Sequence, residues 1–306
     1  MKCMNGLSDW TDLRYFLELA RAGTLSGASR QLKVDHTTVA RRIDRLEAQL
    51  GSTLFDRSRE GYQLTEMGTA LLPHAEVMEG ATLAAQDQID HGYEASAHGV
   101  VTLDAPEVFG LRILAPLLPD LFQRHPALNI DLIVQSRFAN LANREADLAV
   151  VLDPPTTGRY TVVRLANFRM YLYASPQYLA RYPVIRTKED LVGHDFVDFV
   201  QNRLASLALD HVAELGFEPR RRLCCTGMMA QCEAAAQGVG LIVAPPYAVQ
   251  GDSRLVPLLT DSFCVERAFW LVAPTDLYRL QRVRVVWNFL RESAERQSKH
   301  FVLDGE

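Results

Sequence analysis

Residues 24–43, TLSGASRQLKVDHTTVARRI, predict two short helices joined by a tight turn. Asp35 is a favourable N-cap for the second helix, because its carboxylate can accept hydrogen bonds from the free amides of the first turn. From His36 onward an apolar stripe recurs at helical spacing: Val39, Ile43, Leu46 and Leu50. Gly51 follows directly and is typical of the residue just past a helix end. The second helix is therefore expected to begin at His36, to end before Gly51 and to pack this stripe on a core.

The opposite face of this helix carries small hydroxyl side chains near its start and guanidinium groups farther along. Thr37 and Thr38 come first, and Arg41, Arg42 and Arg45 follow. A helix that enters the major groove of DNA needs this order, because its first turns approach base edges closely while arginines reach guanine edges or phosphates. The alternative is a surface helix with merely solvated arginines, which is the usual interpretation of such a helix in isolation.

The flanking segments complete a winged helix-turn-helix pattern and so favour DNA. Upstream, residues 13–20 predict a first helix that ends at Gly23, and Ser26 is expected to cap the short helix that follows. Downstream, residues 53–58 and 61–65 flank the turn Arg59-Glu60-Gly61 and predict a hairpin. The candidate DNA contacts are Ser26, His36, Thr37, Thr38, Arg41, Arg42, Arg45, Arg57 and Arg59.

This stretch resembles the LysR-type transcriptional regulators. The resemblance runs through residues 13–72, LRYFLELARAGTLSGASRQLKVDHTTVARRIDRLEAQLGSTLFDRSREGYQLTEMGTALL, and it involves the caps, the turn glycines and the wing together. One departure is the start of the recognition helix, where many members have Gln-Pro or Gln-Ser and this chain has His36-Thr37-Thr38. The docking mode should survive that change, whereas base preference should not be carried over from relatives.

Length and charge bound the function more loosely. The 306 residues are enough for two or three domains, and the composition is that of an ordinary globular protein. The net charge is −5, and residues 1–66 hold ten basic against nine acidic side chains, so charge alone argues little for nucleic acid. However, five of those ten basic residues fall on the recognition helix and the hairpin. Because no signal-peptide or bilayer-spanning run is present, we expect a cytoplasmic location and no membrane partner.

The five cysteines form no CxxC and no zinc-like spacing, so no metal site is expected. Some LysR-type relatives sense oxidants through cysteine pairs, which leaves a redox-sensing regulator as an alternative. Cys224 and Cys225 fall on a predicted buried strand, and Cys232 on the helix after it. We favour the interpretation that these are small core residues rather than a sensor.

A long helix is expected from Thr65, its cap, to about His91. Positions at spacings of four and three form a helix-pairing seam: Leu71, Ala75, Met78, Thr82, Ala85 and Ile89. From the residues alone, a core-facing helix is the alternative. The resemblance implies the linker helix of a dimer, or of a tetramer, that places two wing domains side by side.

After residues 95–99 the pattern alternates strands and helices and predicts two α/β lobes linked by two crossings. One of the expected helices is ASLALDHVAELG, residues 205–216. This half resembles the periplasmic-binding-protein type of effector domain in the same family, through READLAVV, YASPQYL and GVGLIVAPPYAV. The chain is thus predicted to be an α/β multidomain protein. The expected division is 1–64 for the winged helix-turn-helix domain (helix-turn-helix 24–43), 65–94 for the linker helix, 99–168 with 269–300 for lobe I, and 169–268 for lobe II.

Ligands of open α/β sheets bind where strands end and helices begin. The segments at such places are Ala105, Pro106 and Glu107; Ser136 and Arg137; Gln201 and Asn202; and Thr226, Gly227 and Met228. The resemblance implies that they line the cleft for a small-molecule effector. Relatives that bind carboxylates often have Ser or Thr in the first segment. With Pro106 and Glu107 there, we hypothesise a cleft that holds a zwitterion between Glu107 and Arg137. The alternative is that Glu107 only caps its own helix.

Enzyme motifs are missing from the sequence: there is no GxSxG, HExxH, P-loop or GxGxxG, so no catalytic residue and no cofactor are expected. A solute-binding module without a DNA role is the alternative from another class. The attached winged helix and the missing export signal argue against it. The predicted function is a DNA-binding transcriptional regulator controlled by an effector, with double-stranded DNA and further copies of the chain as partners, and RNA polymerase as another candidate.

Overall fold

The structure is a computed structural model that describes residues 10–58, 61–91, 97–135, 141, 145–204 and 206–296. Its backbone contacts divide the chain into two compact units. The N-terminal unit consists chiefly of Met1–Ala95, and the C-terminal unit of Ser96–Ala139, Ala146–Ala273 and Arg282–Glu306. We describe each unit by itself.

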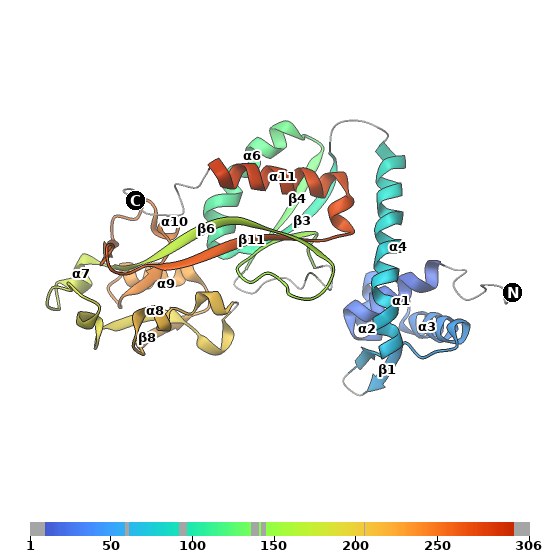
Figure 1. Cartoon of the computed structure of the whole chain (residues 1–306), viewed down its shortest axis with the longest axis horizontal. Helices are drawn as coiled ribbons and strands as arrows, with labels where there is room; N and C mark the ends of the chain where they lie inside the picture. Colours follow the sequence, from blue (N-terminus) through green and yellow to red (C-terminus); the bar gives the residue numbers. More distant parts are fainter. Residues whose placement is uncertain are drawn as a thin grey trace. The chain divides into compact units, whose positions relative to one another are not determined.

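Three helices, a hairpin and a long helix make up the N-terminal unit (Figure 1). Their bounds are α1 Trp10–Ala22, α2 Leu25–Leu32, α3 His36–Leu50, β1 Phe55–Ser58, β2 Gly61–Leu64 and α4 Glu66–His91. Gly23 and Gly51 follow α1 and α3 with φ of +64° and +65°, a conformation that glycine adopts without strain. The expected winged helix-turn-helix is therefore present. Thr24, not Ser26, caps α2, because its hydroxyl accepts from the Gly27 amide at 3.1 Å.

The predicted apolar stripes meet in one core. Phe16 and Leu17 of α1, Ala28 of α2, and Val39 and Ile43 of α3 are all buried. Phe55 of the hairpin closes this core from the wing side, with its ring centroid 5.4 Å from that of Phe16. The small, buried side chain of Ala28 allows the first two helices to pack closely.

The long helix α4 starts as predicted, because the Thr65 hydroxyl accepts from the Gly68 amide at 3.1 Å. Its first half contributes Leu71 and Ala75 to the core of the N-terminal unit. Farther along, the same seam is exposed, and Ile89 keeps 82% of its surface accessible. The predicted seam thus has two parts, one packed on its own domain and one presented outward.

The C-terminal unit alternates strands with helices much as expected. Its elements include β3 Gly99–Pro106, α5 Glu107–Phe109, the π-helical turn η1 Gly110–Leu114, α6 Ala115–Arg124, β4 Leu128–Gln135, β5 Leu148–Val151, β6 Tyr160–Ala174, α7 Pro176–Leu179, η3 Glu189–Leu191, β7 Asp195–Phe199, η4 Gln201–Arg203, η5 Leu207–Leu209, α8 Val212–Leu215, β8 Arg220–Cys225, α9 Met228–Ala236, β9 Ile242–Ala244, α10 Pro246–Val249, β10 Val256–Leu258 and β11 Val265–Pro274. The chain then continues through η6 Leu277–Arg279 into α11 Gln281–Arg296.

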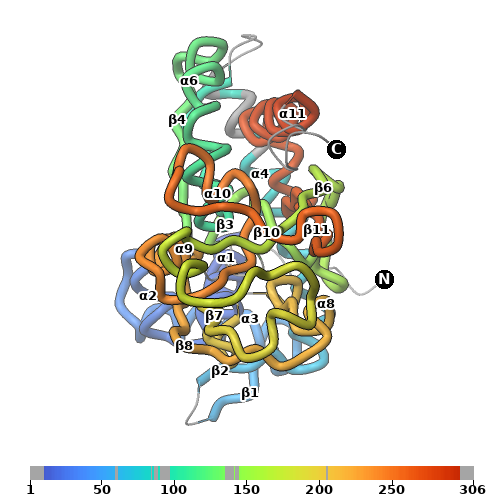
Figure 2. Tube along the Cα trace, turned by 90° about the vertical axis from the view of Figure 1, so that its left-hand side faces the viewer, coloured from blue at the N-terminus to red at the C-terminus, as the bar shows by residue number. Residues whose placement is uncertain are grey.

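Two long strands, β6 and β11, connect the two lobes of this unit. The main sheet has the order β10-β6-β11-β5-β3-β4, with β9 also paired to β6. In lobe I, β3 runs parallel to β4 and β5, whereas lobe II pairs β7 with β8 in parallel. In Figures 1 and 2, α6 and α11 lie on one side of the two long strands, and β7, β8 and α9 lie on the other. The mixed α/β architecture with two crossings agrees with the prediction.

Two local predictions were wrong. Residues 205–216 were expected to form one helix, but the described part forms the short turn η5 and the single helical turn α8. The Ser206 hydroxyl accepts from the Ala208 amide, and the Asp210 carboxylate accepts from the Val212 amide. These two local hydrogen bonds cap separate short turns and so interrupt a continuous helix. The strand β8, expected to be buried, is an edge strand with Cys224 exposed and Cys225 half-buried. Cys232 is buried in α9, as predicted.

Among the described residues, no helix is both long enough and apolar enough to cross a membrane.

Candidate nucleic-acid interface and effector cleft

The start of α3 is built as the sequence predicts. The Asp35 carboxylate accepts from the Thr37 amide at 2.8 Å and from the Thr37 hydroxyl at 2.9 Å. These two hydrogen bonds hold the pKa of Asp35 below its usual range, so the cap is charged at neutral pH. The Thr37 hydroxyl donates its hydrogen to Asp35, and its oxygen can still accept a hydrogen bond.

The predicted contact face of α3 is presented outward. His36, Thr37, Arg41 and Arg45 are exposed, and Thr38 is half-buried. Within the described part of the chain, Arg41 makes no hydrogen bond or ion pair with another residue. Ser26, on α2, is also exposed.

A buried carboxylate organises the other arginines of this face. Asp12 of α1 is fully buried, and its Oδ1 accepts from Arg42 Nη1 at 3.0 Å. Its Oδ2 forms an ion pair with Arg45 Nε at 2.9 Å. The Arg42 guanidinium also lies over the Tyr15 ring, 5.6 Å from its centroid. Asp12 thus connects α1 to α3 and positions the guanidinium groups of Arg42 and Arg45. Its signal was an acid directly before the apolar stripe of the first helix.

On the wing, Arg57 is held by acids of α3. Its Nη2 donates to Asp44 Oδ1 at 2.5 Å and to Glu47 Oε2 at 3.1 Å, and the Asp44 bond is the main cause of its raised pKa. Glu47 also accepts from the Leu54 amide at 2.7 Å, so the recognition helix is hydrogen-bonded to the start of the wing. Arg59 lies outside the described residues.

A cavity of about 70 Å³ lies between the lobes of the C-terminal unit. It is lined by Pro106, Glu107, Val108, Phe109, Leu152, Phe168, Met170, Phe199, Leu209, Thr226, Met228, Pro245, Tyr247 and Phe269. Four of the predicted residues are therefore brought together here, namely Pro106, Glu107, Thr226 and Met228. This volume is about half that of a ~150 Å³ cavity that holds benzene, and the cavity is partly open to solvent.

The remaining predicted cleft residues do not line this cavity. Ala105 is buried behind it, and Gln201 and Asn202 are exposed on η4. Gly227 is not in the lining, but an added Cβ there would lie 3.0 Å from Glu107 Oε2. Ser136 and Arg137 lie outside the described residues. The contact between Arg137 and the carboxylate of a zwitterion therefore stays a prediction.

Glu107 caps a helix other than its own. Its Oε2 accepts from the Met228 amide at 3.0 Å, which is the first residue of α9 in lobe II, although Glu107 itself follows β3 in lobe I. The N-cap residue of α9, Gly227, has no side chain to do this. The alternative stated above expected Glu107 to cap its own helix, α5, whereas its observed hydrogen bond goes to the start of α9. The carboxylate connects the two lobes across the cavity.

Five of the fourteen residues that line the cavity are aromatic, and none of them was among the predicted cleft residues. Phe168 and Phe269 stack with their ring centroids 4.3 Å apart, and Phe109 lies 4.5 Å from Phe269. Tyr247 adds a T-shaped contact to Phe168 at 6.4 Å, and burial raises the pKa of its hydroxyl. Phe168 and Phe269 come from the interiors of the long strands β6 and β11, away from the strand ends that drew attention.

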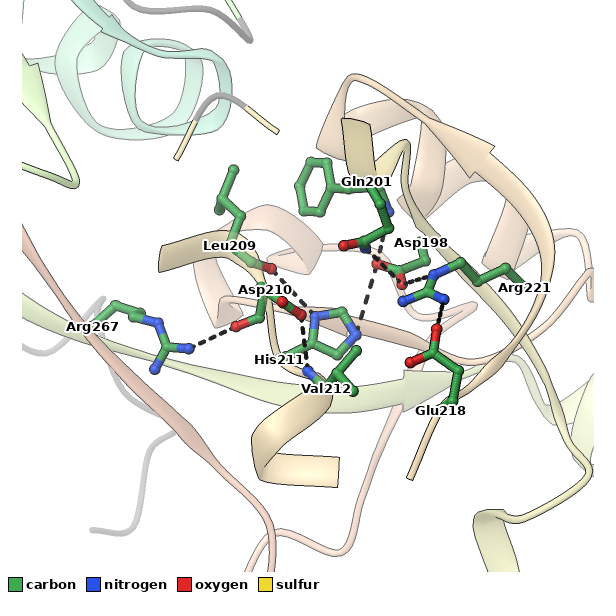
Figure 3. A network of polar contacts seen from close by, with 10 residues as sticks. Asp198, Gln201, Leu209, Asp210, His211, Val212, Glu218, Arg221 and Arg267 are labelled. Atoms are coloured by element: carbon green, nitrogen blue, oxygen red, sulfur yellow. Dashed lines mark hydrogen bonds and ion pairs between the residues drawn. The ribbon is translucent and has the colours of Figure 1, made fainter. Parts of the chain in front are cut away.

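A network of buried charges supports the wall formed by Phe199 and Leu209 (Figure 3). The buried Asp198 carboxylate accepts from Arg221 Nε at 2.8 Å, and the His211 ring nitrogen Nε2 lies 3.7 Å away. Arg267 donates to the Asp210 carbonyl at 2.8 Å. These contacts hold both ends of the segment between β7 and α8, and so determine where Phe199 and Leu209 face the cavity.

Comparisons with known proteins agree with both halves of this description. Residues 10–69 match the family model "Bacterial regulatory helix-turn-helix protein, lysR family", and residues 94–295 match "LysR substrate binding domain". The transcriptional regulator CrgA of Neisseria meningitidis serogroup B is 26% identical over 297 residues, which cover 92% of this chain and 95% of that protein. The Mau operon transcriptional activator of Paracoccus denitrificans is 33% identical over 182 residues, 57% of this chain and 63% of that protein.

Solved structures agree as well. The CrgA structure from Neisseria meningitidis has a TM-score of 0.58 at 25% identity and covers 94% of this chain and 99% of its own. LysG from Corynebacterium glutamicum, solved with bound effector Arg, has a TM-score of 0.64 at 16% identity, covers 94% and 98% of the two chains, and shows the fold alone.

Because a LysR helix-turn-helix precedes the LysR substrate-binding domain in the same chain, the solute-binding alternative is set aside. This family consists of regulators rather than enzymes. Its members bind DNA through the helix-turn-helix and a small-molecule effector through the C-terminal domain, and they typically form oligomers. The chain belongs to the LysR-type transcriptional regulators.

Proposed function

We propose that α3 binds in the major groove of the target DNA, with Thr38 and Arg41 near base edges. The observation that carries this proposal is the capped, outward face of α3, in which Arg41 is exposed and has no partner among the described residues. A guanidinium in this position can donate two hydrogen bonds to a guanine edge. The proposed contacts are Ser26, His36, Thr37, Thr38, Arg41, Arg42, Arg45, Arg57 and Arg59.

Asp12 gives Arg42 and Arg45 a different role from Arg41. Each guanidinium is held on one side by the buried carboxylate, which restricts its orientation. Such pre-oriented groups lose less side-chain freedom when they bind DNA than free ones do. They therefore suit phosphate contacts that position the helix, whereas Arg41 suits base readout.

The exposed half of the α4 seam supports self-association. Met78 and Ile89 are exposed apolar residues on a helix whose earlier seam residues are buried. We propose a homodimer through α4, and a homotetramer built from it, with residues 1–64 as the DNA-binding domain and 65–94 as the dimerisation helix. Two-fold symmetry would place two recognition helices on paired half-sites.

The cavity between the lobes is the proposed effector site. A bound molecule that favours one arrangement of the lobes shifts the population of that arrangement and so alters the geometry of the linked DNA-binding heads. The change would act on DNA spacing and on RNA polymerase, the proposed partner in transcription. Because DNA is its target, we also propose a cytoplasmic location.

A competition binding assay with Arg41→Ala tests the recognition face. Loss of one base contact should weaken specific binding by about 1–3 kcal/mol while non-specific binding changes little. The matched control is Arg222→Ala, which removes an exposed arginine of β8 in the effector domain. Equal losses for Arg41→Ala on specific and random DNA would make Arg41 a phosphate contact, and an unchanged affinity would contradict the proposed face.

A further inference from the structure

The lining of the cavity restricts the chemical class of the effector, a conclusion that rests on the proposed role of the cavity as the effector site. A helix N-terminus is normally the place where a cleft of this kind would attract an anion, since its free amides point outward. Here the first amide of α9 already donates to the chain's own Glu107 carboxylate at 3.0 Å. Glu107 thus occupies the first of the amides that an effector carboxylate would use.

Gly227 leaves room for this internal contact. A Cβ at that residue would meet Glu107 Oε2 at 3.0 Å and Oε1 at 3.3 Å, which is tighter than ordinary contact. The absence of a side chain therefore lets the carboxylate reach the helix end from the other lobe. The approach is close on both oxygens, so the carboxylate has a defined place in the cavity wall.

The charge of the cavity also disfavours an anion. Among the described residues that line it, Glu107 is the one charged side chain, and no arginine, lysine or histidine faces it from the lining. A second carboxylate would therefore meet a like charge at short range, and no described lining residue offers a cation to offset it. The surroundings also screen charge less than water does. This arrangement is opposite to that of an anion-binding site.

The rest of the lining defines what the cavity would accept. Phe168 and Phe269 present stacked rings, Phe109 lies against Phe269, and Tyr247 contacts Phe168 edge to face. A planar ring gains from stacked and edge-to-face contacts with such walls. Glu107 has two oxygens, of which Oε2 is used by the Met228 amide, and a carboxylate can accept several hydrogen bonds.

We propose that the effector is an uncharged aromatic molecule with one hydroxyl or N–H group, that this group donates to Glu107, and that carboxylates are excluded. The ring lies among the four aromatic side chains, and the donor points to the helix end of α9. The Glu107 carboxylate is hydrogen-bonded across the two lobes, so the hydroxyl or N–H group of the effector would bind at this contact between the lobes. Binding of the effector can therefore change the position of one lobe relative to the other.

Three small probes of similar size separate these features. Benzyl alcohol carries a ring and a donor, its isomer anisole lacks the donor, and benzoate carries a carboxylate. Ligand-observed NMR titrations and thermal shifts of the full chain should rank benzyl alcohol above anisole, and both above benzoate, with benzyl alcohol at least about tenfold tighter than benzoate. Benzoate binding as tightly as benzyl alcohol, or no probe binding at all, would overturn the proposal.

Glu107→Gln supplies the second test, since it keeps the acceptor for the Met228 amide and removes the charge. It should strengthen benzoate binding by about tenfold and so remove most of the discrimination. The matched control is Glu233→Gln, which removes an exposed carboxylate of the same helix α9 and should leave the ranking unchanged. Discrimination that survives in Glu107→Gln, with wild-type thermal stability, would assign it to another group.

A separate readout distinguishes the effector class from the effector role. Binding of the full chain to its DNA site is measured with and without saturating benzyl alcohol. A probe that binds the cavity but leaves the DNA complex unchanged would contradict the proposed regulatory role of the cavity and leave the ligand class standing. The binding ranking alone decides the ligand class.

Discussion

Replacing Asp12 by Asn should destabilise the DNA-binding unit more than any exposed change of the same kind. The wild-type carboxylate is fully buried and serves Arg42 with one oxygen and Arg45 with the other. Asn has the same shape but offers one acceptor and one NH₂ group. Whichever way the amide is oriented, one guanidinium then faces a donor instead of an oxygen.

The size of the effect follows from burial and exposure. A hydrogen bond to a charged group contributes about 1.5–3 kcal/mol, and removing one partner of a buried ion pair costs about 3–5 kcal/mol. The arginine side chains are 28% and 47% exposed, so each can turn partly toward water when its partner is lost. We therefore expect the unfolding free energy of this unit to fall by about 1–3 kcal/mol.

Hydrogen exchange measured by mass spectrometry on the full chain reports this unit separately, through amides of α1 and α3. The matched control is Asp44→Asn, whose carboxylate is 57% exposed and pairs with Arg57. It should change protection by less than about 1 kcal/mol. A double-mutant cycle of Asp12→Asn with Arg42→Gln should give a coupling of about 0.5–3 kcal/mol. If Asp12→Asn costs no more than Asp44→Asn, the ion pairs do not organise this face.

Three further outcomes are expected. Arg57→Gln should change stability by less than about 1 kcal/mol, because the Arg57 side chain is 48% exposed and its closer partner, Asp44, is exposed too. It should nevertheless lower the salt slope of DNA binding by about one, as expected for a lost phosphate contact; an unchanged slope would remove the wing from the interface. Ile89→Lys should reduce the dimer or tetramer fraction in sedimentation measurements, since the lysine would be buried unpaired in the proposed seam; an unaltered assembly would place the interface elsewhere. Burial raises the pKa of Cys232 to about 12, so its thiol stays neutral and should resist iodoacetamide at neutral pH, whereas the exposed Cys224 and Cys264 should react. Modification of Cys232 as fast as Cys224 in the native protein would contradict this assignment.

The features that could be predicted from the sequence are mostly local. Asp35, Gly51 and Thr65 end or begin helices through contacts within a few residues, and their patterns predicted the bounds of α3 and α4 well. The rule that ligands gather at strand ends brought Glu107 and Met228 into the same site, although the hydrogen bond between them joins residues 121 positions apart.

Other features depend on partners that no local pattern reveals. Asp12 reaches Arg42 across 30 positions, and only the packing of α1 on α3 brings them together. The apolar spacing of residues 205–216 suggested a helix, but the side chains of Ser206 and Asp210 accept from nearby amides and break it. The exposure of Cys224 follows from the edge position of β8, which apolar residues alone do not predict.

Whether α3 reads DNA sequence can be measured by selecting binding sites from a pool of random DNA duplexes. We expect enrichment of a motif with two-fold symmetry, whose half-sites are separated by whole turns of the DNA helix. On that motif, binding should exceed binding to random duplex by a factor of roughly a thousand or more at physiological salt. A pool without an enriched motif, with binding that is lost equally from all sequences as salt rises, would contradict the account.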